Sequence, residues 1–412
     1  MSFNPMNKMV IVLSIILFAF TAGNATSASK RTAYHERVRN LNTVIDIKMT
    51  DLVEEQIDLI LYKKKKDSQY ILGRTSLYFP KIENALREKG LPDELKYIAV
   101  IESSLMPDAV SWQGATGLWQ FMKGTAVLYG MEVSKYIDER KDVDISTEKA
   151  LVYLSTLYNI YGNWTTALAA YNCGPGNINK AIRKANGSSN YWDFAKYLPK
   201  ETRQYIPKFI AASYLMNYYY LHDITPIEPA NEIKFVGAVK VFDKMTFNTL
   251  RERLGVDYEV LQMLNPIYIK DIIPASKTGK YLLVLPENAL ALYLEKTQQF
   301  DHLVYLYSSD NNASTVLNQS SLRGVEASLR EEGIVMLQNK LTKVFSNKLT
   351  IPTYTNSSKL TKNEKPTHLF KRKESLASLA EKNNIPLDEL LSINGISEQE
   401  DIALNTVISI QK

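Results

Sequence analysis

The pattern of hydrophobic positions changes once along the chain, in a proline-containing stretch around Pro226 and Pro229. From Tyr34 to Tyr220 apolar residues recur every three or four positions, which is typical of amphipathic helices. From Phe235 onward, short strand-like runs alternate with short helical segments. We therefore expect a mainly helical first half, a linker, and a second half that mixes strands and helices.

One helical stripe carries a carboxylate where an apolar residue is expected. Leu95, Ile98 and Ala99 fall on one face, and the next position on that face is Glu102. A partly buried carboxyl group without a neighbouring cation has a raised pKa, as a proton donor near neutral pH requires. The alternative is a structural ion pair or a hydrogen-bonded core acid.

Local signals predict where the neighbouring helices begin and end. In the segment 34–90, a helix is expected around Leu52 to Leu61, and Tyr78 is expected to open a second helix that Gly90 closes. The helix that carries Glu102 is expected to end at Met106-Pro107.

Two further motifs follow this helix. The loop Ser111 to Met122, SWQGATGLWQFM, contains glycines that permit tight turns, and Trp112 and Trp119 are candidates to stack on sugar rings. The segment Ala167 to Gly176, ALAAYNCGPG, predicts a helix that ends in a glycine turn.

In this order, the three motifs resemble the catalytic domain of the lytic transglycosylases of the goose-lysozyme-like superfamily, specifically the membrane-bound transglycosylase D type. The resemblance covers Leu91 to about Tyr205 and implies a mainly α, lysozyme-like fold. It departs from the family pattern at Met106, Lys123 and Cys173, which leaves the shape of the cleft open.

The resemblance also implies roles for individual residues. Glu102 matches the catalytic acid, Tyr171 a tyrosine that hydrogen-bonds its carboxyl group, and Asn172 an asparagine that holds a substrate acetamido group. Alternatively, Tyr171 is a tyrosine of the hydrophobic core and Asn172 is an asparagine that caps a helix. The other candidate substrate-binding residues are Ser103, Ser111, Gln120, Met122, Glu201 and Tyr205.

An acidic segment follows the loop. Asp138-Glu139-Arg140 resembles a family segment in which acids and an arginine tie a loop to the next helix, a structural role. Ser146 or Thr147 is expected to cap that next helix.

The second half contains a divergent repeat. Segments around Asn265 and Asn394 align, and each ends in a strand-like run. Strand, two short helices and strand, with asparagine closing the second helix, resembles the LysM carbohydrate-binding module, which is a small α+β (βααβ) unit. The C-terminal copy matches better, although Lys373-Glu374 replaces the usual Gly-Asp.

These patterns predict six segments. They are a signal peptide at 1–28, a helical lead-in at 34–90, the catalytic domain at 91–225, a divergent LysM-like module at 234–287, a helical segment with polar linkers at 288–366, and a LysM-like module at 367–412. A chain that ends near Glu228 is expected to keep every catalytic residue, and so to cut soluble glycan fragments at close to the full-length rate.

The composition limits which classes of partner and which cellular compartment we expect for this protein. Lys8 and the apolar run Met9 to Phe20 predict an export signal, and therefore a periplasmic or cell-envelope protein whose only membrane association is an uncleaved signal. The net charge of +5 and the absence of a dense basic field argue against nucleic acid. The four scattered histidines give no metal-ligand spacing, and the resemblance implies no cofactor.

The resemblance implies an enzyme that cleaves the bond between N-acetylmuramic acid and N-acetylglucosamine in peptidoglycan glycan strands and leaves 1,6-anhydro ends. One alternative is a hydrolytic muramidase, with Asp108, Asp142 or Glu201 as the base. The other is a non-enzymatic wall-binding protein, against which an intact Glu102 argues. The sequence identifies no protein partner.

Overall fold

A computed structural model describes residues 31–41, 43–308, 313–316, 367–369, 376–383, 385–394 and 407–409. The predicted signal peptide and the Lys373-Glu374 departure lie outside these residues. The chain divides into two compact units. The first combines Met1–Lys64, Pro199–Asp223 and Asn363–Lys412, and the second combines Lys65–Leu198 and Ile224–Lys362. No helix within the described ranges is long and apolar enough to cross a membrane.

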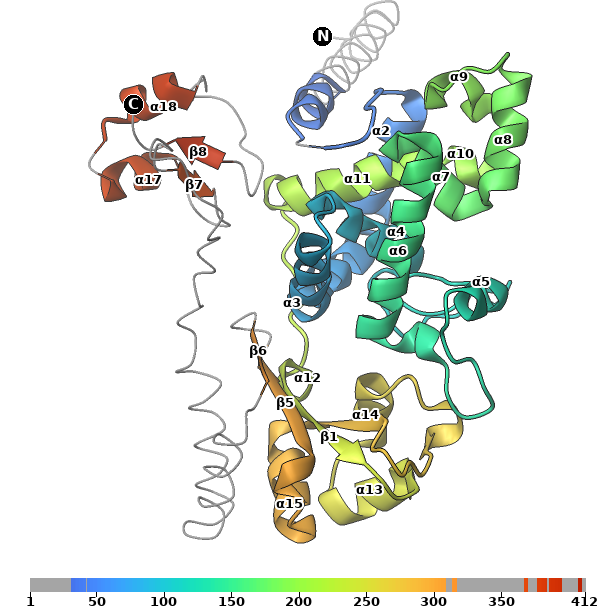
Figure 1. The fold of residues 1–412 in the computed structure, drawn as a ribbon. Helices are drawn as coiled ribbons and strands as arrows, with labels where there is room; N and C mark the ends of the chain where they lie inside the picture. Colours follow the sequence, from blue (N-terminus) through green and yellow to red (C-terminus); the bar gives the residue numbers. More distant parts are fainter. Residues whose placement is uncertain are drawn as a thin grey trace, which may run out of the picture. The chain divides into compact units, whose positions relative to one another are not determined.

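The helical part of the first unit is built around aromatic side chains. Tyr34 donates a hydrogen bond to Asp58 over 2.8 Å, and Tyr214 and Tyr218 are fully buried, as expected for core residues. Figure 1 shows α11 crossing α2. The elements are a helix over residues 31–39, α2 (Asp51–Asp58), η1 (Leu59–Lys63), α10 (Lys200–Arg203), α11 (Tyr205–Tyr218) and η5 (Tyr219–His222).

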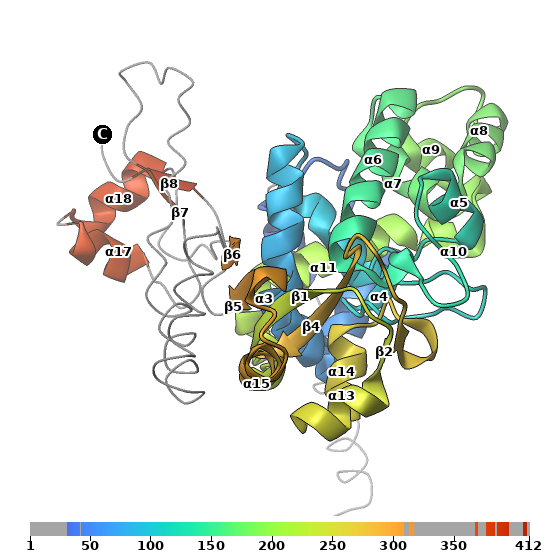
Figure 2. The ribbon, with the colours of Figure 1, turned by 60° about the horizontal axis from the view of Figure 1, so that its bottom comes forward.

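The second unit begins with the helices of the lysozyme-like region. In Figures 1 and 2, α6 and α7 lie side by side. The elements are α3 (Lys65–Glu88), η2 (Asp93–Lys96), α4 (Tyr97–Ser103), α5 (Lys123–Leu128), η3 (Glu139–Lys141), α6 (Val143–Tyr161), α7 (Trp164–Cys173), α8 (Pro175–Lys184), α9 (Tyr191–Phe194) and η4 (Ala195–Tyr197).

The start of α3 differs from the prediction. The helix begins at Lys65 instead of Tyr78 and continues through Pro80. Proline lacks the amide N–H of a helix interior and usually breaks it, but the buried stripe that includes Leu72, Leu77 and Ile82 continues on both sides. Packing of this stripe holds the helix together across the proline.

The start of α6 also differs from the prediction. Its N-cap is Asp142, whose Oδ1 accepts a hydrogen bond from the amide of Ile145 over 2.8 Å. Ser146 and Thr147, which were predicted as caps, lie buried within the first turns. A carboxylate satisfies the exposed amides of a helix start and its positive end at once, so the earlier acid takes the cap.

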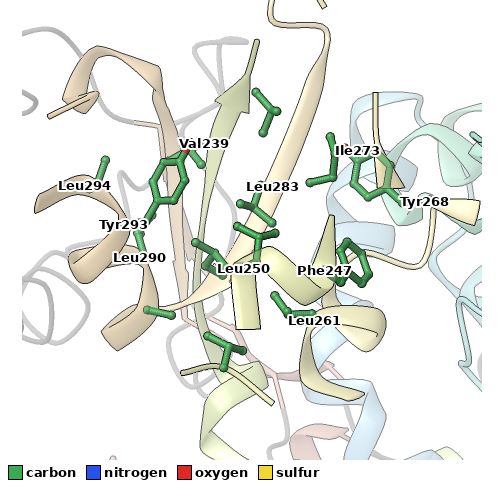
Figure 3. Packing of buried hydrophobic residues seen from close by; sticks show 14 of the residues in the cluster. Val239, Phe247, Leu250, Leu261, Tyr268, Ile273, Leu283, Leu290, Tyr293 and Leu294 are labelled. Atoms are coloured by element: carbon green, nitrogen blue, oxygen red, sulfur yellow. The ribbon is translucent and has the colours of Figure 1, made fainter. Parts of the chain in front are cut away.

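Within the described residues, the second unit continues with a LysM-like module that has a four-stranded antiparallel sheet in the order β4-β1-β5-β6. The helices α13 and α15 belong to its hydrophobic core (Figures 1 to 3). The elements are α12 (Asn231–Lys234), β1 (Phe235–Val241), β2 (Met245–Thr246), α13 (Phe247–Leu254), α14 (Tyr258–Leu264), η6 (Ile269–Asp271), β3 (Ile272–Ile273), β4 (Tyr281–Pro286), α15 (Glu287–Thr297), η7 (Phe300–His302), β5 (Leu303–Ser308) and β6 (Ala313–Val316).

This core continues past the boundary predicted at residue 287. Leu290, Leu294 and Leu303 are buried in it, and β5 pairs with β1. The strand β6 lies in a stretch that was predicted to be a polar connector. Its alternating small and β-branched residues fit an edge strand once β5 offers a partner, which composition alone does not reveal.

The predicted repeat is visible in the two asparagines. Asn265 donates to the carbonyl oxygen of Leu261 over 3.0 Å, and Asn394 donates to that of Leu390 over 2.8 Å. In the C-terminal copy, β7 and β8 pair antiparallel around a small core of Leu379, Ala380 and Leu390. Its elements are β7 (Thr367–Leu369), α17 (Leu376–Lys382), α18 (Leu387–Asn394) and β8 (Val407–Ser409).

Candidate active site

Glu102 lies half-buried in the last turn of α4, one residue from its end. The buried stripe before it includes Leu95, Ile98 and Ala99, each with 0% of its surface exposed. The apolar face thus packs inward, and Glu102 continues this face at the end of the helix, as the periodicity predicted.

The helix ends earlier than Met106-Pro107. Ser104 and Leu105 have φ angles of 56° and 58°, both in the left-handed region, and the Ser104 carbonyl accepts a hydrogen bond from Arg74 over 3.1 Å. Left-handed backbone costs a non-glycine residue roughly 1 kcal/mol or more. Burial of Leu105, which has 0% of its surface exposed, and the Arg74 contact offset that cost. The chain therefore reverses immediately after the acid.

Ser103 joins α4 to the glycine-containing loop. Its hydroxyl lies 3.0 Å from the carbonyl oxygen of Ala99 and 2.9 Å from that of Leu118, and it accepts from the amide of Met106. Ser103 is buried, with 5% of its surface exposed. Its hydroxyl thus holds the helix against the loop, and its predicted contact with substrate stays a prediction.

The loop Ser111 to Met122, here called the cleft loop, is folded by its own hydrogen bonds. The main chain of Thr116 pairs with that of Phe121 in both directions at 3.0 Å. The Ser111 hydroxyl accepts from the amide of Ala115 over 3.0 Å. Gln120 has a φ of 50° and donates to the carbonyl of Gly117 over 2.9 Å. These bonds make the loop a defined platform.

The two tryptophans of the cleft loop occupy opposite environments. Trp119 has none of its surface exposed, so the prediction that it stacks on sugar rings is wrong. Trp112 is 92% exposed and Met122 is 45% exposed, which leaves both available to a ligand. The sequence could not separate the two indoles, because each is flanked by loop residues and no period assigns either one to the core.

A buried ion pair fixes the cleft loop from behind. Arg140 and Asp138 form a two-pronged contact, with Nε to Oδ1 at 2.9 Å and Nη2 to Oδ2 at 2.7 Å. The remaining Nη1 donates to the carbonyl oxygens of Gly114 at 2.9 Å and Phe121 at 3.1 Å. The structural role predicted for this segment is confirmed, and the atoms that it holds belong to the cleft loop.

Gly117 makes this arrangement possible. Its φ is +86°, and a Cβ atom there would lie 1.7 Å from the carbonyl oxygen of Arg140. Only glycine permits both the backbone conformation and so close a contact.

Tyr171 links α7 to the cleft loop. Its hydroxyl donates to the carbonyl oxygen of Trp119 over 2.8 Å. Burial, and next the nearby Glu102 carboxylate, raise the pKa of Tyr171 well above its usual value. The hydroxyl therefore stays protonated beside the acid. Asn172, the next residue of α7, is half-buried.

The last two candidates, Glu201 and Tyr205, belong to the first unit. Glu201 is exposed on α10, whereas Tyr205 is buried at the start of α11 with 4% of its surface exposed. The structure thus brings Glu102, Ser103, Tyr171 and the cleft loop together within the second unit. Within the described ranges, no group of three or more His, Cys, Asp or Glu side chains is placed to hold a metal ion.

Comparison with known proteins agrees with this architecture. The Transglycosylase SLT domain family matches residues 79–194, and the family described as "Lytic transglycosylase MltD, LysM-like domain" matches residues 236–300. Membrane-bound lytic murein transglycosylase D of Escherichia coli is 26% identical over 371 residues, which cover 84% of this chain and 78% of that protein. The chain is similar to this enzyme over most of its length.

Other relatives match a shorter part of the chain. The soluble lytic murein transglycosylase of Escherichia coli is 30% identical over 132 residues, or 30% of this chain and 20% of that protein. Among solved structures, the 70 kDa soluble lytic transglycosylase from the same species is 28% identical with a TM-score of 0.30. That alignment covers 35% of this chain and 24% of the other.

Proposed function

We propose that this protein is a lytic transglycosylase that cleaves the β-1,4 bond between N-acetylmuramic acid and N-acetylglucosamine in peptidoglycan. The observation that carries this proposal is the placement of Glu102, at the end of α4, beside the protonated hydroxyl of Tyr171 and the cleft loop. The two family matches, to an SLT domain and to a LysM-like domain of the type D enzymes, support the same substrate class.

In the proposed reaction, Glu102 donates its proton to the glycosidic oxygen as the bond to C1 of the muramyl residue breaks. The resulting carboxylate accepts the proton of the C6 hydroxyl of that residue, and the C6 oxygen bonds to C1. The products are a 1,6-anhydromuramyl end and a strand with a free 4-hydroxyl group. An internal nucleophile has a high effective concentration, so one carboxyl group serves where hydrolysis ordinarily uses two.

The other candidates receive supporting roles in this scheme. Tyr171 orients Glu102. The Tyr171 hydroxyl can do so because its hydrogen bond to the carbonyl oxygen of Trp119 holds it in place. Asn172 binds a substrate acetamido group, and Ser111, Gln120 and Met122 line the cleft. Glu201 and Tyr205 are candidate substrate-binding residues by resemblance alone. Glu201, which is exposed, would stabilise positive charge in the transition state.

A hydrolytic muramidase is the second candidate function. It needs a carboxylate to activate water. Asp142 is occupied as the cap of α6, and burial raises its pKa above the usual range. Asp108 is exposed and lines a cavity of about 630 Å³ beside Leu105, which keeps it available as a base.

Product analysis separates the two reactions. Purified sacculi are digested, and the muropeptides are analysed by mass spectrometry. Anhydro ends lack one water relative to reducing ends. Products that carry only reducing ends would replace the proposed lyase activity with hydrolysis.

We further propose that residues 1–28 direct export to the periplasm or cell envelope, where the LysM-like modules contact peptidoglycan strands. The Escherichia coli relative is a membrane-bound enzyme, which is consistent with this location. The N-terminal residue of the mature protein, read by mass spectrometry, tests the cleavage. A mature chain that starts at Met1 in the cytoplasmic fraction would refute the export proposal.

A further inference from the structure

The LysM-like module and the lysozyme-like region share a hydrophobic core. Ile137, from the loop between α5 and α6, has 1% of its surface exposed and is buried with Val239, Phe247 and Leu283 of the module. Figure 3 shows the module residues of this core, including Val239, Phe247, Leu261 and Leu283. A side chain from the catalytic half therefore completes the interior of the module.

Main-chain hydrogen bonds reinforce this contact. The loop 131–138, here called the docking loop, bridges to the module between Ile137 and Tyr268. The amide of Asp138 donates to the carbonyl of Ile267 over 3.0 Å, and the amide of Ile269 donates to the carbonyl of Tyr136 over 2.8 Å. The docking loop thus forms one antiparallel β-bridge with the module.

Ion pairs formed by Lys280 of the module also hold the docking loop. Lys280 Nζ lies 2.6 Å from Glu132 Oε2 and 3.9 Å from Glu139 Oε1. Glu139 Oε2 in turn accepts from the amide of Glu132 over 2.6 Å. Lys280 is half exposed, so solvent screens this pair and its contribution is modest. The shared core and the main-chain bonds carry the attachment.

Hydrogen bonds connect this attachment to the cleft loop. Asp138 bonds to the module through its amide and to Arg140 through its carboxylate, and Arg140 holds the carbonyls of Gly114 and Phe121. Two buried residues therefore connect Ile267 of the module to the loop that carries Ser111, Gln120 and Met122. Each connection is a hydrogen bond between groups that the fold holds in place.

We propose that the module 235–308 is a structural part of the active site, and that Ile137 and Asp138 are positioning residues through which it fixes the cleft loop. This inference rests on the proposed lytic transglycosylase activity. It separates two roles of the module, because positioning acts on every substrate, whereas wall anchoring acts only on an insoluble polymer.

The test removes one docking bond in the full-length protein. Ile269→Pro deletes the amide that donates to Tyr136, and Tyr268, with φ −86° and ψ 105°, already has the extended backbone that precedes proline. Ile269→Ala is the matched control, since it trims the side chain but keeps the amide. Ile137→Val gives a second, milder change that removes one methyl group from the shared core.

Two readouts are measured on each variant. Amide hydrogen exchange of residues 111–122 reports the order of the cleft loop, with α6 and α7 as internal references for the fold. Kinetics on short soluble glycan fragments report catalysis without wall anchoring. For Ile269→Pro we expect faster exchange in the cleft loop and a kcat/KM reduced roughly tenfold, because misplacement of substrate-positioning groups by a fraction of an ångström is costly. The pH profile should not change, since Glu102 is untouched.

Ile269→Ala should match wild type in both readouts, and Ile137→Val should fall between them. If Ile269→Pro and Ile137→Val leave both loop exchange and soluble-fragment kinetics at wild-type values, the module does not position the cleft loop. The exchange measurement requires no activity. A wild-type protein that makes no anhydro products would therefore overturn the proposed function without deciding this inference.

Discussion

The indole nitrogen of Trp119 donates a hydrogen bond to the hydroxyl of Thr147 over 2.9 Å, and both side chains are buried. The bond ties the cleft loop to α6. The carbonyl of the same tryptophan accepts from Tyr171 of α7. Trp119 is thus the point at which the loop and two helices are held together.

This contact leads to opposite expectations for the two tryptophans of the loop. Trp119→Phe loses a buried hydrogen bond and leaves space, so unfolding free energy should fall by about 1–3 kcal/mol. Trp112→Ala should change stability by less than about 0.5 kcal/mol, because the side chain is exposed, and should raise KM for glycan. Urea unfolding and kinetics on soluble fragments measure the two effects. Weaker glycan binding from Trp119→Phe at unchanged stability would reverse the assignment.

Replacement of the proposed acid should abolish cleavage. Glu102→Gln keeps the shape of the side chain but cannot donate and recover a proton, so turnover should fall by at least about 100-fold at an unchanged melting temperature. Asp108→Asn is the companion variant, since it neutralises the exposed acid that is the candidate base of a muramidase. Turnover within a few fold of wild type in Glu102→Gln would remove Glu102 from the mechanism. A large loss in Asp108→Asn would instead favour the muramidase.

Tyr171→Phe should lower kcat more than it weakens glycan binding, because the hydroxyl, which donates to the carbonyl of Trp119, is proposed to orient the acid. Its pKa is raised well above the ordinary value of about 10, so this hydroxyl does not ionise in the working range. The variant should therefore keep both limbs of the pH–rate profile. Tyr153→Phe, one layer further from the acid, is the control. Loss of binding alone would make Tyr171 a substrate contact.

Disruption of the buried ion pair should be costly. Asp138→Ala leaves the Arg140 guanidinium buried without its counter-charge, which typically lowers unfolding free energy by about 3–5 kcal/mol. Lys81→Ala breaks the exposed pair with Asp144 and should cost less than about 1 kcal/mol. Chemical denaturation of both variants makes the comparison. Equal, small losses would show that the contacts of Arg140 to the cleft loop do not depend on Asp138.

The structure also reverses one expectation from the sequence. A chain that ends at Glu228 exposes Ile137 and removes the partners of Tyr136 and Asp138. We now expect this truncated protein to cut soluble fragments at least several-fold more slowly than the full chain, and to show faster exchange in the cleft loop. Kinetics on soluble fragments test this directly. An equal rate would restore the original expectation that the two halves divide the work.

The sequence predicted the elements that side-chain periodicity defines. The stripe of Leu95, Ile98 and Ala99 placed Glu102 correctly on a helix, and the strand-helix-helix-strand pattern predicted the LysM-like module. Periodicity could not predict contacts made by backbone atoms, such as those that Arg140 and Ile269 make. The left-handed pair Ser104 and Leu105 was also missed, because neither residue type favours that conformation.

The segment that joins the two halves of the second unit lies against α3. The amide of Ile227 donates to the carbonyl of Gln69 over 2.9 Å, and a Cβ atom on Gly73 would lie 1.8 Å from the Ile227 oxygen. A segment packed this closely against a helix is not a flexible linker. If the first LysM-like module binds a glycan strand, as proposed, the fold would hold that strand at a fixed distance from the bond that is cleaved.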